Sequence, residues 1–143
     1  MKTIIIIPSR MASTRFPGKP MVKIAGIPMV QRVWEQAIAA KIGEVYVACS
    51  ENEVYDLISE RGGKAILTDP KIPSGTDRIF AAFQQIENSS DIKYIINLQG
   101  DMPIIKPNHI KKVIEPLYKD CSIGSLVTTL KEDEINNPNI TKA

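Results

Sequence analysis

The feature that most constrains the fold is a run of four isoleucines near the amino terminus, Ile4 to Ile7, which follows Thr3 and is closed by Pro8. A strand with one face in water alternates apolar and polar residues, whereas this run is apolar at every position and predicts a strand buried on both faces. Such strands belong to parallel sheets that carry helices on each side. Because a proline ends the run, the chain is expected to reach the surface there, and the next loop begins at the carboxyl end of a strand.

Alternating strand and helix patterns continue along the chain. Further strands are expected at 44–50, 64–68, 93–98 and 123–130, a short extended piece at 21–27, and helices at 28–41, 51–60, from about 74 through 86, and 107–117. Ser50 and Glu53 are spaced as a capping box for the second helix. The third helix is expected to bury Ile79, Phe80, Phe83 and Ile86. This order predicts an α/β fold, a Rossmann-like three-layer sandwich with a mainly parallel sheet and right-handed crossovers.

Composition excludes several classes of protein. Apolar residues make up 43% of the chain and charged residues 24%, which is typical of an ordinary soluble globular domain. The net charge of +2 gives a field too weak for a nucleic-acid binder. The run Ile4 to Ile7 is too short for a signal-peptide core or a membrane span, so we expect a cytoplasmic protein without a membrane partner. Cys49 and Cys121 lack metal-site spacing and are expected to be buried apolar fillers, and His109 is expected on the surface.

The loop after the first strand concentrates positive charge. Arg10, Arg15 and Lys19 lie between Pro8 and Pro20, in a stretch whose proline and glycine residues disfavour a helix. Three cations beside exposed backbone N–H groups suit a polyphosphate. A surface loop could carry the same charges for solvation alone, so the charges by themselves leave both interpretations open.

Two further loops are expected at the same edge of the sheet, because the strands before them run parallel to the first strand. The segment from Ser74 to Arg78 offers hydroxyl and N–H groups at a helix amino terminus, which suits an anion or is simply an N-cap. The other loop contains Gln99, Gly100 and Asp101. Asp101 is placed to hold a Mg²⁺ on a nucleotide phosphate, or else to cap a turn. The sequence therefore predicts one ligand crevice where three loops meet.

The common glycine-rich nucleotide motifs G-x-G-x-x-G and G-x-x-x-x-G-K-[ST] do not occur in the sequence, so any nucleotide is held by a different loop. The stretch from Ile7 to Pro20, Ile-Pro-Ser-Arg-Met-Ala-Ser-Thr-Arg-Phe-Pro-Gly-Lys-Pro, resembles the nucleotide-binding signature of the 3-deoxy-manno-octulosonate cytidylyltransferases, the CMP-Kdo synthetases. The segments Ser74 to Arg78 and Gln99 to Asp101 match two further motifs of that family in order and separation. The resemblance runs over the whole chain.

The resemblance implies a fold of the nucleotide-diphospho-sugar transferase type. It also implies a Mg²⁺-assisted reaction of CTP with 3-deoxy-manno-octulosonate (Kdo) that gives CMP-Kdo and pyrophosphate for lipopolysaccharide synthesis. The catalytic residues that it implies are Lys19, Arg15 and Asp101, with Asp101 as the Mg²⁺ ligand. The residues implied to contact CTP or the sugar acid are Pro8, Arg10, Ser13, Arg15, Lys19, Ser74, Gly75, Thr76, Arg78 and Gln99, of which Gln99 reaches toward the sugar acid. Met102 stands where many members have an acidic residue, so the resemblance gives this loop no carboxylate role beyond that of Asp101.

Members of that family continue well beyond residue 143. The part that follows is expected to supply most of the sugar-acid pocket, a second metal-binding carboxylate and much of a homodimer contact. Residues 1–143 are therefore expected to form a single nucleotide-binding α/β domain, C-terminally truncated relative to the family. Three other interpretations stay open: a CTP-binding fragment without catalysis, a cytidylyltransferase for a different acid sugar, and an α/β interaction domain without a ligand.

Overall fold

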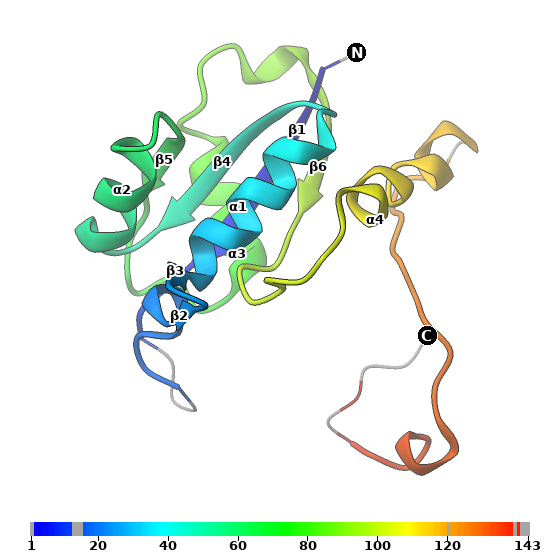
Figure 1. Ribbon diagram of the computed structural model, residues 1–143. Coiled ribbons are helices and arrows are strands. Elements are labelled where there is room, and N and C mark those ends of the chain that lie inside the picture. The colour runs from blue at the N-terminus through cyan, green and yellow to red at the C-terminus, as the bar shows by residue number, and fades with distance from the viewer. Residues whose placement is uncertain (1, 13–15, 120, 139, 141–143) are drawn as a thin grey trace.

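The computed structural model describes residues 2–12, 16–119, 121–138 and 140. Its main sheet has four parallel strands in the order β5-β4-β1-β6 (Figure 1). The strands are β1 (Lys2–Ser9), β4 (Glu44–Cys49), β5 (Lys64–Leu67) and β6 (Ile92–Asn97). β1 lies between two neighbours, and its four isoleucines are fully buried, as the sequence predicts.

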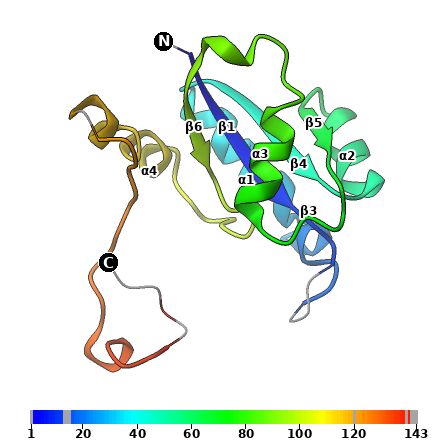
Figure 2. The ribbon, with the colours of Figure 1, turned by 180° about the vertical axis from the view of Figure 1, so that it is seen from behind.

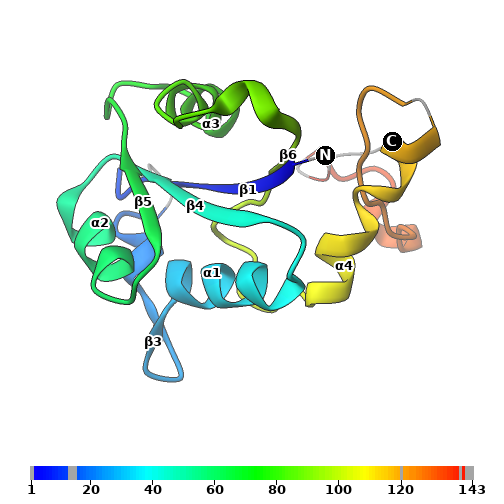
Figure 3. The same ribbon diagram turned by 90° about the horizontal axis from the view of Figure 1, so that it is seen from above.

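Helices cover both faces of this sheet (Figure 3). The helices α1 (Met29–Ala40), α2 (Asn52–Ser59) and α4 (Pro107–Lys112) lie on one side, and α3 (Gly75–Phe83) lies on the other, in front of the sheet in Figure 2. Successive isoleucines of β1 point to opposite faces of the sheet. Ile5 and Ile7 belong to the core cluster under α1 and α2, and Ile4 and Ile6 belong to the cluster under α3. The predicted three-layer α/β sandwich with a parallel sheet is confirmed.

A small antiparallel hairpin of β2 (Lys23–Ile24) and β3 (Ile27–Pro28) precedes α1. Arg32 of α1 donates a hydrogen bond from Nε to the carbonyl oxygen of Ile24 at 2.8 Å and so ties the hairpin to the helix. The helix begins one residue later than predicted, because Pro28 still belongs to β3. Short 3-10 helices span Lys19–Met21, Ser89–Asp91, Glu115–Lys119 and Glu132–Glu134. Across the described ranges, no helix has the length and apolar character that crossing a membrane requires.

The predictions for Ser50 and Cys121 are wrong. Ser50 and Glu53 form no capping box, because the Ser50 hydroxyl donates to Glu51 at 2.8 Å instead and α2 begins only after Glu51. Cys121 is exposed, whereas Cys49 is buried as predicted. Cys49 ends a strand inside the sheet, while Cys121 lies outside the helices and strands, and this difference in element accounts for the difference in burial. The predicted surface position of His109 is confirmed on α4.

The buried face of α3 differs from the predicted one. Phe80 has 60% of its surface exposed, although the sequence pattern counts it as core. Arg78 is only 1% exposed and takes a place on the buried face beside Ile79 and Ala82. A prediction from helical periodicity places apolar residues on the buried face and charged residues on the exposed face. It therefore misses a buried arginine such as Arg78, whose guanidinium donates hydrogen bonds to the loop before α3.

The strand expected at 123–130 does not form. This segment has no strand pairing, and Ile123 and Val127 are 87% and 77% exposed. Residues 122–125 line a cavity together with the last residues of β6, but they do not pair with that strand. Figures 1 and 2 show the chain farther on running away from the sheet, so within the described residues this segment lacks the hydrogen bonds that a strand requires. The apolar, β-branched composition of the segment was a sound indication of strand propensity, but propensity alone does not supply a partner.

Candidate functional site

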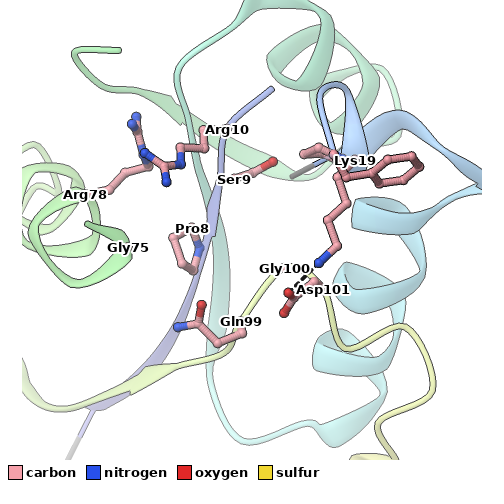
Figure 4. Close-up of a pocket in the computed structure, with 11 residues that line it drawn as sticks. Pro8, Ser9, Arg10, Lys19, Gly75, Arg78, Gln99, Gly100 and Asp101 are labelled. Carbon is pink, nitrogen blue, oxygen red and sulfur yellow. Dashed lines mark hydrogen bonds and ion pairs between the residues drawn. The ribbon is translucent and has the colours of Figure 1, made fainter. Parts of the chain in front are cut away.

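A cavity of about 570 Å³ opens at the carboxyl edge of the sheet, beside the ends of β1 and β6 (Figure 4). The chain winds outward from β1 in both directions, to β4 and β5 on one side and to β6 on the other. Ligands of open α/β sheets bind at such a switch point. Among the described residues, the cavity is lined by Pro8, Ser9, Arg10, Phe16, Lys19, Pro20, Gly75, Arg78, Gln99, Gly100 and Asp101.

Three chain segments meet at Pro8, at the end of the isoleucine run. A Cβ atom added to Gly100 would lie 2.7 Å from the carbonyl oxygen of Pro8, and one added to Gly75 would lie 3.3 Å from Pro8 Cγ. The first separation is shorter than side-chain carbons tolerate, and the second is tight. Glycine at these two positions therefore lets the loops after β5 and β6 pack against the end of β1. The loops converge on one cavity, as the sequence predicts.

Lys19 and Asp101 form an ion pair at this cavity (Figure 4). Lys19 Nζ lies 2.7 Å from Asp101 Oδ2, although the two residues are 82 positions apart in the sequence. Lys19 begins a 3-10 helix directly after Gly18, whose φ of 72° is readily available to glycine. The lysine and aspartate side chains are 37% and 51% exposed, so both remain accessible to a ligand. An ion pair this exposed is weak and can exchange its partners.

Two arginines extend the positive charge along the cavity. Arg10 Nη1 donates to the carbonyl oxygen of Pro73 at 3.3 Å, and Figure 4 shows the guanidinium groups of Arg10 and Arg78 beside each other. Burial lowers the pKa of Arg78, and the charge of Arg10 lowers it further, while the nearby Glu51 carboxylate acts in the opposite direction. Arg78 keeps its charge at neutral pH despite this lowered pKa, because the ordinary pKa of arginine lies far above 7.

The hydrogen bonds of Arg78 go to the loop that precedes α3. Its guanidinium donates to the hydroxyl of Thr68, to the carbonyl oxygen of Asp69 at 3.3 Å and to the carbonyl oxygen of Ile72 at 3.4 Å. These acceptors are all neutral, and together they fix the loop against the helix. Arg78 lines the cavity, as expected, but the described contacts use it to hold protein backbone, and its predicted contact with cytidine stays a prediction.

The structure supports the simpler interpretation of Ser74. Its Oγ accepts the backbone N–H of Asp77 at 3.1 Å and donates to Asp77 Oδ2 at 2.6 Å, which is an N-cap of α3. Neither Ser74 nor Thr76 is among the residues that line the cavity, whereas Gly75 is. Any contact of these two residues with a nucleotide stays a prediction.

Most of the described residues that line the cavity are predicted from the sequence, and a few are not. Ser13 and Arg15 lie outside the described residues, so their predicted roles stay predictions. Gln99 lines the cavity, and its Nε2 donates to Asn97 Oδ1 at 2.7 Å. The missed lining residues are Ser9, Phe16 and Pro20. All three lie next to predicted residues in the stretch from Ile7 to Pro20, so their position in that motif was the signal that could have identified them.

Asp101 is the carboxylate that the described cavity lining offers to a metal ion. Within the described ranges, no group of three or more histidine, cysteine, aspartate or glutamate side chains is arranged to hold a metal. Mg²⁺ commonly takes one or two protein carboxylates and completes its shell with phosphate oxygens and water. A single exposed aspartate beside a cationic cavity therefore suits a Mg²⁺ that arrives with a nucleotide, and does not suit a metal held by protein alone.

The family of the chain follows from comparison with known proteins. A family model described as "Cytidylyltransferase" matches residues 4–143. The chain belongs to this cytidylyltransferase family. A 3-deoxy-manno-octulosonate cytidylyltransferase from Paramagnetospirillum magneticum is 44% identical over 98% of this chain, and one from Parvibaculum lavamentivorans is 43% identical over the same share. The chain spans 58% and 55% of the length of these two curated relatives.

Solved structures of cytidylyltransferases share the fold. A CMP:2-keto-3-deoxy-manno-octonic acid synthetase complexed with CTP matches 84% of this chain and 48% of its own, with a TM-score of 0.77 and 38% identity. A cytidylyltransferase from Leptospira borgpetersenii matches 82% of this chain and 50% of its own, with a TM-score of 0.66 and 25% identity. The resemblance to the CMP-Kdo synthetases and the fold expected from it are confirmed.

Proposed function

We propose that this chain is the nucleotide-binding part of a CMP-Kdo synthetase, which transfers CMP from CTP to Kdo and releases pyrophosphate. The observation that carries the proposal is the meeting of Lys19 and Asp101, 2.7 Å apart, at a cavity on the carboxyl edge of the sheet. A cation for phosphate and a carboxylate for its metal ion thereby occupy one site. The CTP complex of the similar synthetase supports the choice of nucleotide, and the names of the curated relatives support the choice of sugar acid.

In the proposed reaction, the anomeric hydroxyl oxygen of Kdo bonds to the α-phosphorus of CTP. The bond from that phosphorus to the oxygen bridging the α- and β-phosphates breaks, pyrophosphate leaves, and the hydroxyl proton passes to water. Arg10, Arg15 and Lys19 bind the phosphate oxygens and hold the attacking and leaving groups in line. Their positive charge also balances the charge that grows on the departing pyrophosphate. Mg²⁺, when bound, neutralises phosphate charge in the same way, and Asp101 is the residue that holds it.

The other residues that the family resemblance implies bind the substrates. Pro8, Gly75 and the amino-terminal residues of α3, with Ser13 from the loop, surround the nucleoside, and Gln99 reaches toward the sugar acid. The sugar-acid pocket, a further metal-binding carboxylate and a homodimer contact belong to the part of the family that the chain does not match. Residues 1–143 span 58% of the length of the first relative, so a second candidate function for these residues taken by themselves is CTP binding without turnover.

Calorimetry and a pyrophosphate-release assay test the proposal together. The chain is titrated with CTP in the presence of Mg²⁺ and again in the presence of a chelator, with ATP as the control nucleotide. We expect binding of CTP that weakens without Mg²⁺. Pyrophosphate release that depends on Kdo supports the transferase, and binding without release supports the second candidate. Release with a different acid sugar, but not with Kdo, would assign another substrate, and absence of CTP binding would refute both candidates.

A further inference from the structure

Glu51 contacts the loop from Arg10 to Pro20, here called the cation loop, without being among the described residues that line the cavity. Its Oε2 accepts the backbone N–H of Met11 at 3.0 Å, and its Oε1 accepts the hydroxyl of Ser50 at 2.8 Å. Both hydrogen bonds are partly buried. Both carboxylate oxygens are therefore engaged, and one of them holds the backbone of the cation loop.

The register of the sheet brings Glu51 to this loop. β1 and β4 are neighbouring parallel strands, and their last paired residues are Ser9 and Cys49. Met11 and Glu51 each follow two residues after that pair, so their hydrogen bond continues the alignment of the two strands beyond the sheet. The position of Glu51 is thus set by the rigid centre of the fold, whereas the segment that it holds is a loop.

Because Glu51 directly precedes α2, capping of this helix would be a simpler role for its carboxylate, but its contacts exclude that role. Glu51 is the N-cap residue of α2, but its side chain makes no capping hydrogen bond. Only its backbone oxygen serves the helix, by accepting the N–H of Tyr55 at 3.2 Å. The carboxylate is directed to the cation loop and to Ser50, so a role in helix capping does not account for it.

Met11 is the point at which the cation loop is closed. Its carbonyl oxygen accepts the N–H of Gly18 at 2.9 Å, while its own N–H is held by Glu51. Arg10 stands immediately before this closure and Lys19 immediately after it. The position of Met11 therefore sets where two phosphate-binding cations leave the backbone, and a shift of about 1 Å at such a position is enough to impair binding and catalysis.

The charge of Glu51 supports the same role. The carboxylate raises the pKa of Arg78, whereas the cation of Arg10 lowers it. This anion, which is not among the described residues that line the cavity, therefore offsets repulsion between two arginines that do line it.

We propose that Glu51 is a positioning residue for nucleotide binding, which acts through Met11 to hold the cation loop in its phosphate-binding arrangement. The proposal rests on the proposed CTP-binding function of the cavity. Glu51 itself contacts no nucleotide.

Hydrogen exchange and calorimetry on the whole chain test this role. In Glu51→Ala, the amides of Met11 and Gly18 are expected to exchange at least about tenfold faster by NMR, while the amides of β1 and β4 keep their rates, because only the loop closure is lost. The dissociation constant of CTP with Mg²⁺ is expected to rise about tenfold. Glu51→Gln keeps an oxygen acceptor for Met11 and loses only the charge that offsets the two arginines, which is the smaller of the two effects, so both quantities are expected to stay within about threefold of those of the unmodified chain.

Glu53→Ala is the matched control, because Glu53 is an exposed carboxylate in the first turn of the same helix. It is expected to change neither loop exchange nor CTP affinity. Equal losses in the Gln and Ala variants at Glu51, or a lower melting temperature of Glu51→Ala with unchanged Met11 exchange and CTP affinity, would overturn the proposal. If the unmodified chain binds no CTP, the proposed function fails, and the exchange of Met11 still decides whether Glu51 holds the loop.

Discussion

The ion pair between Lys19 and Asp101 is expected to matter far more for nucleotide binding than for folding. At 2.7 Å in water, the attraction between the two charges is about 1.5 kcal/mol. Ordering two side chains that are 37% and 51% exposed, together with screening by salt, reduces this to about 0.2–1 kcal/mol. Lys19→Ala and Asp101→Asn should therefore each lower the free energy of unfolding by less than about 1 kcal/mol, as measured with urea.

The same substitutions should weaken the binding of CTP strongly. A hydrogen bond to a charged group contributes about 1.5–3 kcal/mol, so loss of the Lys19 contact with phosphate should raise the dissociation constant roughly 10- to 150-fold. Asp101→Asn should abolish most of the dependence on Mg²⁺, because a neutral amide is a poorer ligand for the ion. Calorimetry with and without Mg²⁺ on both single variants and the double variant measures these effects.

Lys2→Ala is the matched control for this experiment. Lys2 and Glu44 form an ion pair of 2.9 Å with 40% and 37% exposed side chains, at the amino edge of the sheet. Its removal should cost a similar fraction of the stability and leave CTP affinity unchanged. The reasoning would be refuted if Lys19→Ala bound CTP as tightly as the unmodified chain. A loss of unfolding free energy above about 2 kcal/mol would also contradict it, since the pair would then be structural.

Three further predictions concern acid stability, thiol reactivity and loop packing. Hydrogen bonds from two lysines and a tyrosine lower the pKa of Glu44 from 4.5 to about 2, so its contribution is present above pH 4.5 and is lost as the pH falls toward 2. In urea unfolding between pH 5 and pH 2, Glu44→Gln should remove about 1 kcal/mol of this dependence, a small value because the side chain is 37% exposed. A thiol reagent at pH 8 should modify the exposed Cys121 and spare Cys49, whose pKa is raised to about 11 by burial, until the chain is unfolded. Gly100→Ala should cost about 1–3 kcal/mol of unfolding free energy and weaken CTP binding, because its Cβ would lie 2.7 Å from the carbonyl oxygen of Pro8.

The parts of the fold that follow from local patterns could be predicted from the sequence. The isoleucine run specifies the central strand by itself, because a segment without a polar face can only be buried on both sides. The position of the cavity follows from the same run, since parallel strands bring their carboxyl ends, and the loops that follow, to one edge. The convergence of Lys19 and Asp101 on one cavity needed only that argument and the two loops, whereas the direct ion pair between them was not predicted.

Features that depend on contacts between distant segments could not be predicted in this way. Arg78 can be buried because its guanidinium donates hydrogen bonds to three neutral acceptors in the preceding loop. The conformation of that loop cannot be read from residue spacing in the sequence. The contact between Glu51 and Met11 depends on the register of two strands, which an apolar run leaves unspecified. The predicted strand at 123–130 is wrong for the same reason, because a strand needs a neighbouring strand to pair with, and the apolar pattern of the segment does not show whether one is present.

The charges around the cavity divide into two groups that have different tasks. Arg78 is buried and bonded to backbone and hydroxyl oxygens, so removing its partners would leave a desolvated charge, and its arrangement should persist when a ligand binds. Lys19 is half-buried and Arg10 is exposed, and they hold one carboxylate and one carbonyl oxygen, respectively, both of which phosphate oxygens can replace at little cost. Internal acceptors thus keep these two cations near the positions in which a nucleotide would need them, and the buried cation fixes the loop beside them. This arrangement would lower the cost of ordering the site when the proposed nucleotide binds, because the cations need not be brought into place from disordered positions.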